Sequence, residues 1–448
     1  MFLELFKSLL FKYYVGNEPD RWFRLIRSIP PEFVKKAQGR DFKAVVKLVA
    51  ERSPFYREKF KKLGIDPRSV EKPSDLGEFY TTSKDLLENP PEAFLCGTPR
   101  IGFETTGTSS NKNKRIFFSQ EEIDSIAKDA PAGLLLLGLR RGDKVCSTMH
   151  SSFWNAGFTI REAMRHFDCF YVNADKLPPI EFYERAQSYK FDAIVCEPSW
   201  LVLYTELCKQ RGGFWPIKFF LVGGENMTEH ARRFVEEAWN CNVFIGYGMT
   251  ETFGSVGVEC PSKMGYHINE FHNWCEILKP DADGYGELVV TTLQRSTMPL
   301  LRYRTSDVTR LIDEPCTCAI PNIRRIAKIR GRSDEMINCG MGNISPPIFE
   351  YAFDGIQGIT NDWQVAVKKD GPLDLIEFRF EIANGSSAAE LEKVVTDQFK
   401  TRYPDYWRNV EMGLYKLACR FEPRGTLRKK QKLIKVVDER HELWESKI

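Results

Sequence analysis

The stretch FFLVGGENMTEHARRFVEEAWNCNVFI, residues 219 to 245, decides the fold of this chain. It starts with an apolar run, Phe219 to Val222, and ends with a second one, Val243 to Ile245. Between them lies a segment of helical periodicity that Thr228 can cap. Its apolar side chains share one helical face: Ala231, Phe234, Val235, Ala238 and Trp239. A strand, a helix and a strand in this order predict an α/β sheet with parallel strands.

The same alternation extends over about residues 100 to 330. Further short apolar runs predict strands at Lys144 to Thr148, Cys169 to Val172 and Ala193 to Cys196. Residues 1 to 95 have a helical, amphipathic pattern instead. We therefore predict a large N-terminal domain, residues 1–331, built of α/β layers around a parallel sheet.

The pattern changes after Arg332. Apolar runs at Phe378 to Ile382 and Leu414 to Phe421 predict strands, and Ala388 to Phe399 predicts a helix. These elements indicate a small, mobile α+β domain over residues 332–448, which is a usual size for a domain.

Composition and charge exclude several classes of protein. The chain has 448 residues, 42% of them hydrophobic and 28% charged, which is ordinary for a globular protein. Its net charge of +3 is too small to indicate a nucleic-acid partner. No apolar run approaches the roughly 20 residues of a membrane span. The 12 cysteines are scattered, so they indicate reduced thiols in the cytoplasm and not a disulfide framework.

The N-terminal segment MFLELFKSLLFKYYVG resembles a signal peptide only in its apolar content. Glu4 lies where a basic region belongs, Lys7 and Lys12 interrupt the apolar run, and no small-residue cleavage site follows. We expect a helix docked on the domain surface, with loose membrane-surface contact as the alternative.

The run ETTGTSSNKNKRI, residues 104 to 116, has the chemistry of a phosphate-binding loop. Small hydroxyl side chains and a glycine allow backbone N–H groups to surround an anion, which nearby cations neutralise. The hydroxyl and glycine positions are Thr105, Thr106, Gly107, Thr108, Ser109 and Ser110, and the cations are Lys112, Lys114 and Arg115. The GxxxxGK[ST] spacing is absent. A solvated Ser/Thr/Asn turn remains the alternative.

Two glycine-rich strand ends form the next candidates. Gly223, Gly224 and Glu225 follow the strand at 219–222, and glycines there let a flat ligand approach the backbone. The segment FIGYGMTETFG offers the flat ring of Tyr247 and, at Glu251, an oxygen ligand suitable for magnesium. By themselves both segments are equally consistent with plain turns.

Three later motifs complete the series. Arg302, Arg304 and Asp307 surround a tyrosine at a strand end, which suits a ribose diol or a sheet-edge ion pair. The segment IRGRSDEMINCGMGNISP carries Arg332 and Asp334 at the predicted domain boundary. The last motif, RGTLRKKQKLIKVVDER from residue 424, is rich in lysine, and a solvated basic loop is its alternative reading.

Together these motifs resemble the adenylate-forming superfamily of acyl-CoA ligases and adenylation domains, and most of all the phenylacetate–CoA ligases. The resemblance rests on SPFYREKFKKLGID, GGENMTEHARRFVEEAW, YGMTE, MPLLRYRTSDVTRL and GRSDEMINCGMGNISP, and spans about residues 45 to 440. It implies an enzyme that activates a carboxylic acid, expected to be an aryl or other aromatic acid, with ATP and Mg²⁺. The acyl group is then transferred to coenzyme A.

The resemblance also implies a role for each matching residue. Thr105 to Lys112 hold the ATP phosphates, Gly223, Gly224 and Glu225 line the adenine pocket, and Tyr247 and Gly248 lie against the base. Thr250 contacts the α-phosphate, Glu251 binds magnesium, and Asp307 and Arg332 contact the ribose. Lys432 is the catalytic lysine, and Asp334 is the hinge about which the C-terminal lid rotates. The chain departs from the family pattern at Ser110, Ser306 and Gln431, where relatives usually carry glycine.

The acid pocket is expected around the segment HSSFWNAG. His150 can meet the substrate carboxylate, and Phe153 and Trp154 can flank an aryl or acyl group. Ordinary core packing of the same side chains is the alternative.

A zinc site is predicted from Cys260, His267, Cys316 and Cys318. Three thiolates and an imidazole supply four tetrahedral ligands, which closes the site and makes it structural. Reduced surface cysteines are the alternative.

The sequence therefore predicts a cytoplasmic AMP-forming acid–thiol ligase, with a homodimer implied by the resemblance. One alternative keeps the adenylation and changes the acceptor to an amine or to the thiol of a carrier protein. Another is a non-catalytic nucleotide-binding homologue.

Overall fold

The computed structural model describes residues 18–105, 113–225, 227, 229–333, 337–339, 341–370, 373–383, 387–428 and 433–440. The helix predicted within residues 1–16 lies outside these ranges. The chain forms two compact units. The first contains the described residues up to Met227, together with Ala231–Thr305 and Thr309–Lys328. The second contains residues 229–230, Ser306–Val308 and the described residues from Ile329 onward. No helix within the described ranges combines the length and the apolar character needed to cross a bilayer.

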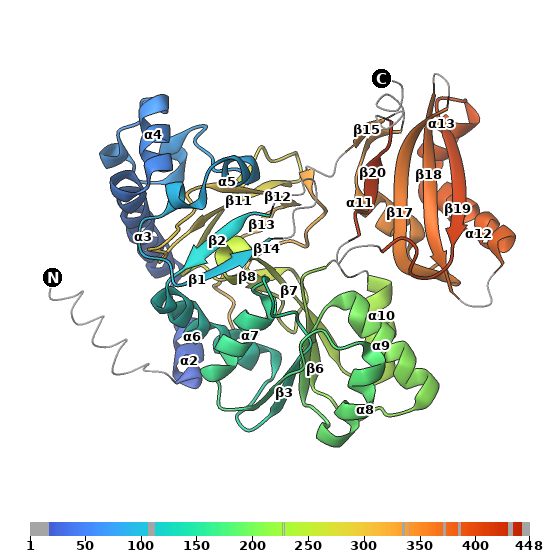
Figure 1. The fold of residues 1–448 in the computed structure, drawn as a ribbon, viewed down its shortest axis with the longest axis horizontal. Helices are drawn as coiled ribbons and strands as arrows, with labels where there is room; N and C mark the ends of the chain where they lie inside the picture. Colours follow the sequence, from blue (N-terminus) through green and yellow to red (C-terminus); the bar gives the residue numbers. More distant parts are fainter. Residues whose placement is uncertain are drawn as a thin grey trace. The chain divides into compact units, whose positions relative to one another are not determined.

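A nine-stranded sheet is the centre of the first unit (Figure 1). Its strands, in spatial order, are β13 (Leu311–Ile312), β14 (Arg325–Ile326), β9 (Tyr266–Ile268), β8 (Gly254–Val258), β7 (Asn242–Met249), β6 (Phe219–Val222), β5 (Ala193–Cys196), β3 (Lys144–Ser147) and β4 (Phe170–Asn173). The run from β7 to β4 is parallel, and the pairs from β7 to β13 are antiparallel. The prediction of an α/β fold with a mostly parallel sheet is confirmed.

Helices cover both faces of the parallel strands (Figure 1). Those bordering this sheet are α6 (Gln120–Leu137), α7 (Ala156–Arg165), α8 (Pro179–Tyr189), α9 (Pro198–Arg211) and α10 (Glu229–Trp239). Successive side chains of a strand point to opposite faces. Accordingly Phe219 packs in the core formed with α6 and α7, whereas the ring of Phe220 lies 5.3 Å from that of Trp239 in α10.

The rest of the first unit consists of N-terminal helices and smaller sheets. The helices are α2 (Pro19–Ser28), α3 (Pro31–Arg52), α4 (Pro54–Leu63) and α5 (Ser83–Glu88). A hairpin pairs β1 (Ile101–Glu104) with β2 (Arg115–Phe118), and a three-stranded sheet has the order β10 (Asn273–Leu278), β11 (Gly286–Thr292), β12 (Tyr303–Thr309).

The second unit is α+β. A four-stranded sheet has the order β19 (Lys416–Glu422), β18 (Leu373–Ile382), β17 (Ile359–Asp370), β20 (Val436–Asp438), and a hairpin pairs β15 (Ile337–Cys339) with β16 (Gly342–Ile344). Its helices are α11 (Pro346–Phe353), α12 (Ala388–Arg402) and α13 (Pro404–Glu411). The core between sheet and helices is rich in phenylalanine, with Phe349, Phe353, Phe378 and Phe399 all buried.

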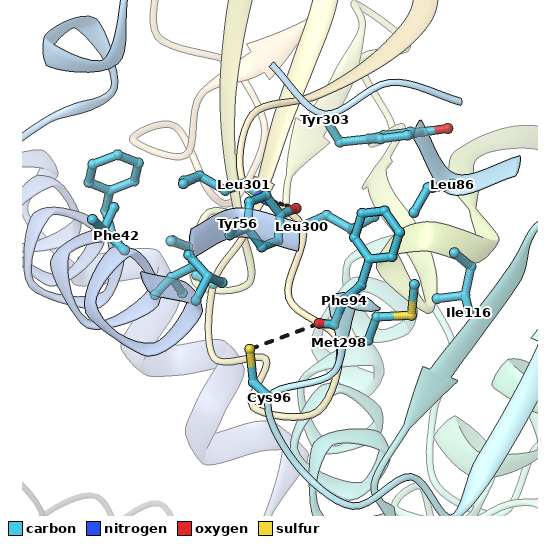
Figure 2. Packing of buried hydrophobic residues seen from close by; sticks show 14 of the residues in the cluster. Phe42, Tyr56, Leu86, Phe94, Cys96, Ile116, Met298, Leu300, Leu301 and Tyr303 are labelled. Carbon is cyan, nitrogen blue, oxygen red and sulfur yellow. Dashed lines mark hydrogen bonds between the residues drawn. The ribbon is translucent and has the colours of Figure 1, made fainter. Parts of the chain in front are cut away.

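A closed ring of hydrogen bonds fastens the N-terminal helices to the start of β12. The Leu301 N–H donates to the Tyr56 hydroxyl (3.0 Å), which lies 2.9 Å from Thr81 Oγ1, and Thr81 Oγ1 donates to the Leu301 carbonyl (2.7 Å). Figure 2 shows the Tyr56 hydroxyl directed at Leu301 within this apolar core. Tyr56 and Thr81 are fully buried, so the ring has no access to water. It fixes the position of Tyr303, two residues further along the chain.

Tyr56→Phe should lower the free energy of unfolding by about 1–3 kcal/mol, because the buried Leu301 N–H loses its acceptor. Urea denaturation of the variant and of the wild type measures this difference. Tyr189→Phe, at a ring that is 39% exposed, is the control and should change stability little. Equal stability of Tyr56→Phe and wild type would contradict the structural role of the hydrogen bonds among Tyr56, Thr81 and Leu301.

Candidate functional site

Two of the predicted nucleotide-binding segments lie at the carboxyl edge of the parallel sheet. β6 ends at Val222, so Gly223, Gly224 and Glu225 follow it directly, and Gly223 lies against its neighbour strand because an added Cβ would be 3.1 Å from the Gly246 carbonyl. β7 continues past β6 to Met249 and carries Tyr247 and Gly248. Since ligands of open α/β sheets bind beyond the carboxyl ends of the strands, this edge is the candidate site.

Glycine is required at position 248. A Cβ there would lie 2.3 Å from the Gly254 carbonyl oxygen, so no side chain fits. Beside it the Tyr247 ring stacks 6.1 Å from that of Tyr266, at an interplanar angle of 28°. The flat ring of Tyr247 therefore lies next to the point where the backbone at Gly248 comes close to the backbone at Gly254.

Glu251 lies in the 3₁₀ turn Thr250–Thr252 after β7, at this edge of the sheet, and carries a buried carboxylate. The residue is 4% exposed, and its Oε1 accepts hydrogen bonds from Lys114 Nζ (2.6 Å) and the Tyr303 hydroxyl (2.8 Å). Lys114 also donates to the Tyr303 hydroxyl at 3.0 Å and to Ser83 Oγ at 3.3 Å. Four segments far apart in the sequence therefore meet in one buried polar network.

The network keeps Glu251 ionised. Burial raises the pKa of this carboxyl, but the charge of Lys114 and the hydrogen bonds from Lys114 and Tyr303 outweigh it, so its pKa is lowered. Burial lowers the pKa of Lys114, but the charge of Glu251 outweighs it, so that pKa is raised. An ionised carboxylate held in this way is a suitable hard ligand for a magnesium ion.

A buried arginine holds the backbone of Glu251. Arg295 donates from Nη1 to the Glu251 carbonyl (3.0 Å) and from Nη2 to the Phe117 carbonyl of β2 (3.0 Å). Its guanidinium also lies 3.4 Å from the Glu122 carboxylate and 4.0 Å from the centre of the Phe118 ring. This residue links β2 to the turn that carries Glu251.

The predicted phosphate loop is described only at its two ends. Thr105 N–H donates to the Lys114 carbonyl (3.0 Å), directly after the β1–β2 pairing of Glu104 with Arg115. The Thr105 hydroxyl is buried and has no hydrogen-bond partner among the described residues. Thr106, Gly107, Thr108, Ser109 and Lys112 lie outside the described residues, as do Asp334 and Lys432.

One of the predicted acid-pocket residues, Phe153, contacts the end of β1. The Glu104 N–H donates to the Phe153 carbonyl (2.8 Å), and the Phe153 ring is 67% exposed. His150 has a partner at each ring nitrogen, Asp175 at 3.0 Å and Ser152 at 3.1 Å, and its ring lies 5.1 Å from that of Trp154. The role of these residues toward an acid stays a prediction.

Asp307 and Arg332 lie together in the second unit. They form a backbone bridge, and Arg332 Nη1 is 3.5 Å from Asp307 Oδ1. The preceding residue, Ser306, has a φ of 66°, in the left-handed region that glycine adopts most easily. The expectation that relatives carry glycine here therefore has a conformational reason. Contact of this pair with a ribose stays a prediction.

The four predicted zinc ligands converge in the first unit. The ligand atoms of Cys260, His267, Cys316 and Cys318 all lie within 4.8 Å of one another. The Cys260 and Cys316 sulfurs are 3.6 Å apart, close to the roughly 3.8 Å that tetrahedral zinc–sulfur bonds require. A hydrogen bond from Cys318 lowers the pKa of the Cys260 thiol against the opposing effect of burial.

The imidazole of His267 is oriented through both of its nitrogens. Its Nε2 lies 3.2 Å from Cys318 Sγ, and its Nδ1 lies 3.0 Å from the Ile323 carbonyl, which fixes the ring as metal-ligating histidines usually are fixed. The donor set and its geometry fit a closed zinc site.

Three residues of this site were not predicted as site residues from the sequence. The sequence marks Lys114 only as one cation of the loop, and Tyr303 only as the tyrosine between two arginines. Those arginines bind structural partners: Arg302 pairs with Glu276 at 3.1 Å, and Arg304 pairs with Glu287. Nothing in the sequence distinguishes Arg295.

Comparison with solved structures identifies the class of fold. A 2-hydroxyisobutyryl-CoA ligase in the postadenylation state superposes with a TM-score of 0.77, at 18% identity, over 94% of this chain and 93% of that protein. The O-succinylbenzoate coenzyme A synthetase of Bacillus subtilis, solved with ATP and a magnesium ion, gives 0.55 at 18% identity, over 75% and 68%. The chain thus has the fold of the acyl-CoA ligases of the adenylate-forming superfamily.

Sequence comparison identifies the relatives within that class. A phenylacetate–coenzyme A ligase of Thermus thermophilus is 26% identical over 83% of this chain and 87% of that protein, and one of Escherichia coli is 28% identical over 78% and 82%. No protein-family model matches the chain. The resemblance predicted from the motifs is confirmed: the chain is related in sequence to phenylacetate–CoA ligases.

Replacing Lys114 by methionine should destabilise the protein by about 3 kcal/mol, because it leaves the buried Glu251 charge unpaired. With the cation gone, burial, which is the largest effect on Glu251, is opposed mainly by the hydrogen bond from Tyr303, and the pKa of Glu251 rises. In the wild type the lowered pKa gives a stabilisation that is present above the unfolded-state pKa and is lost on acidification. In Lys114→Met the raised pKa makes the folded state bind the proton more tightly than the unfolded state, so acidification should recover part of the lost stability. Denaturant unfolding at a series of pH values measures both effects.

The double variant Lys114→Met/Glu251→Gln is the matched control. It removes both charges and should recover most of the stability that the single variant loses. A Lys114→Met variant that loses stability on acidification in the same way as the wild type would contradict the coupling of the two residues.

Proposed function

We propose that this protein is an AMP-forming acid–thiol ligase. It activates a carboxylic acid, an aryl acid such as phenylacetate, to an acyl-adenylate with ATP, and then transfers the acyl group to coenzyme A. The single observation that supports this most is the buried Lys114–Glu251–Tyr303 network at the carboxyl edge of an acyl-CoA-ligase fold. The sequence relationship to phenylacetate–CoA ligases supports both the reaction and the acid.

The chemistry follows from charge. A carboxylate that attacks the α-phosphorus brings one anion onto another, so the site must supply positive charge and hydrogen-bond donors. Magnesium, when bound at Glu251, would polarise the phosphate oxygens. Lys114 keeps the Glu251 carboxylate ionised, and Thr105 and Thr250 place hydroxyls near the same edge.

The second unit is proposed as the lid. In this proposal it carries Lys432 to the α-phosphate for adenylation and then turns about Asp334 so that coenzyme A can reach the adenylate. Support comes from the sequence motif and from the division of the chain into two compact units.

Pyrophosphate release tests the reaction. Wild-type protein with Mg-ATP should release pyrophosphate with phenylacetate or a related aryl acid and should consume coenzyme A in equal amount. Lys432→Ala should slow adenylation by roughly 10²- to 10³-fold and leave ATP binding nearly unchanged. Lys435→Ala is the matched control, since Lys435 lies 4.3 Å from the centre of the Trp363 ring in the second unit, and it should retain adenylation.

Three outcomes would change the proposal. Pyrophosphate release without consumption of coenzyme A would favour an amine or a carrier-protein thiol as acceptor. No release with any acid would favour a non-catalytic homologue. Full activity of Lys432→Ala would show that another lysine performs this step.

We also propose structural zinc at Cys260, His267, Cys316 and Cys318, a cytoplasmic location and a homodimer. The scattered spacing of the 12 cysteines supports a reducing compartment. Size-exclusion chromatography with light scattering tests the dimer.

Metal analysis tests the zinc site. Protein purified without chelator should contain about one zinc per chain. Cys316→Ser should lower zinc content and thermal stability together, because metal binding stabilises the folded state. Cys275→Ser, at a buried cysteine in β10 outside the cluster, should keep its zinc. The proposal would be wrong if wild-type protein contained no zinc as purified and a chelator did not change its thermal stability.

A further inference from the structure

Asn155 occupies a helix start but does not cap the helix. It is the residue before α7, and asparagine is among the favoured capping residues because its side-chain oxygen accepts from the next turn. Here the side chain makes no cap hydrogen bond. Its Oδ1 instead accepts from the hydroxyl of Thr250, 95 positions away in the chain, at 3.2 Å. The side chain is thus directed at the turn that carries Glu251.

The amide nitrogen of Asn155 is left with two hydrogens and no acceptor. Asn155 is 6% exposed, and no acceptor for Nδ2 is found in the part of the chain that the structure describes. A buried unpaired amide donor costs about 1–3 kcal/mol, so it indicates a partner that binds there. The donor is adjacent to Thr250, where Oδ1 fixes the orientation of the amide.

The segment around Asn155 is tightly packed. A Cβ at Gly157 would lie 2.1 Å from Ser151 Oγ and 2.4 Å from the Met149 carbonyl, and the Gly157 N–H donates to the His150 carbonyl at 3.0 Å. The amide is therefore held in place before any ligand arrives. A fixed donor facing a developing anion contributes more than a mobile one.

The hydroxyl of Thr250 has only one hydrogen, and Asn155 accepts it. In this arrangement Thr250 cannot donate to a phosphate, whereas Asn155 Nδ2 can. We propose that Asn155 is a ligand-binding residue of the adenylation step: its Nδ2 donates a hydrogen bond to an anionic oxygen next to Thr250, supplied by the nucleotide phosphate or by the carboxylate of the acid. This assignment rests on the proposed function.

Three variants test it at pH 8, where a buried aspartate is more readily ionised. Asn155→Ala removes the donor and the acceptor. Asn155→Asp keeps the acceptor for Thr250 and places an anion where the donor was. Thr159→Val, at a threonine on the same helix whose buried hydroxyl also lacks a described partner, is the control. Circular dichroism and thermal unfolding establish that each variant is folded.

Pyrophosphate release with Mg-ATP and phenylacetate should fall in the order wild type, Asn155→Ala, Asn155→Asp. The alanine variant should lose roughly 10- to 100-fold in kcat/KM, the range for a hydrogen bond to a charged group, and the aspartate variant should lose more. Thr159→Val should stay within about twofold of wild type. A raised KM for ATP with weaker AMP binding in calorimetry assigns the oxygen to phosphate, and a raised KM for phenylacetate alone assigns it to the acid.

An aspartate variant as active as wild type beside an impaired alanine variant would overturn the proposal, because Asn155 would then only orient Thr250. The proposal would also be overturned if all variants were as active as the wild type, or if Thr159→Val lost as much activity as Asn155→Ala. In either case pyrophosphate release by the wild type would leave the proposed function intact. If the wild type releases no pyrophosphate, AMP binding still compares the variants. A wild type that neither binds AMP nor turns over would remove both proposals.

Discussion

The ion pair between Lys114 and Glu251 is the interaction on which the candidate site depends. Both side chains are largely buried, at 14% and 5% exposed, and their nitrogen and oxygen are 2.6 Å apart. Removing two charges from water is costly, so such a pair persists only when further hydrogen bonds complete it. Tyr303 and Ser83 supply them here. The pair therefore forms only while the β1–β2 hairpin, the turn after β7 and the start of β12 keep their positions relative to one another.

The surrounding structure meets that requirement by two means. The Tyr56–Thr81–Leu301 ring fixes the start of β12, and Arg295 connects the backbone of Glu251 to β2. Tyr56, Thr81, Leu301 and Arg295 are not themselves predicted to contact a ligand. Residues outside the predicted chemistry thus set the distances between the charged groups of the site.

The sequence predicted the central elements because their signals are local. Ala193–Cys196 and Phe219–Val222 are short apolar runs, and the observed strands have those same bounds. The prediction ended the next strand at Ile245, but β7 continues to Met249, because Gly246 to Met249 pair with β8 although they lack an apolar run. The convergence of Cys260, His267, Cys316 and Cys318 was predictable from residue chemistry alone. The Lys114–Glu251 and Asn155–Thr250 contacts were not, since they join residues 137 and 95 positions apart.

A crystal structure of the protein with Mg²⁺ and a non-hydrolysable ATP analogue would test the central claim most directly. We predict a magnesium ion at about 2.1 Å from a carboxylate oxygen of Glu251, the distance expected for this ion. We also predict Lys114 Nζ in contact with Glu251 or with a phosphate oxygen. A nucleotide bound away from the carboxyl edge of β6 and β7, with the Lys114–Glu251 network untouched, would contradict this assignment of the site.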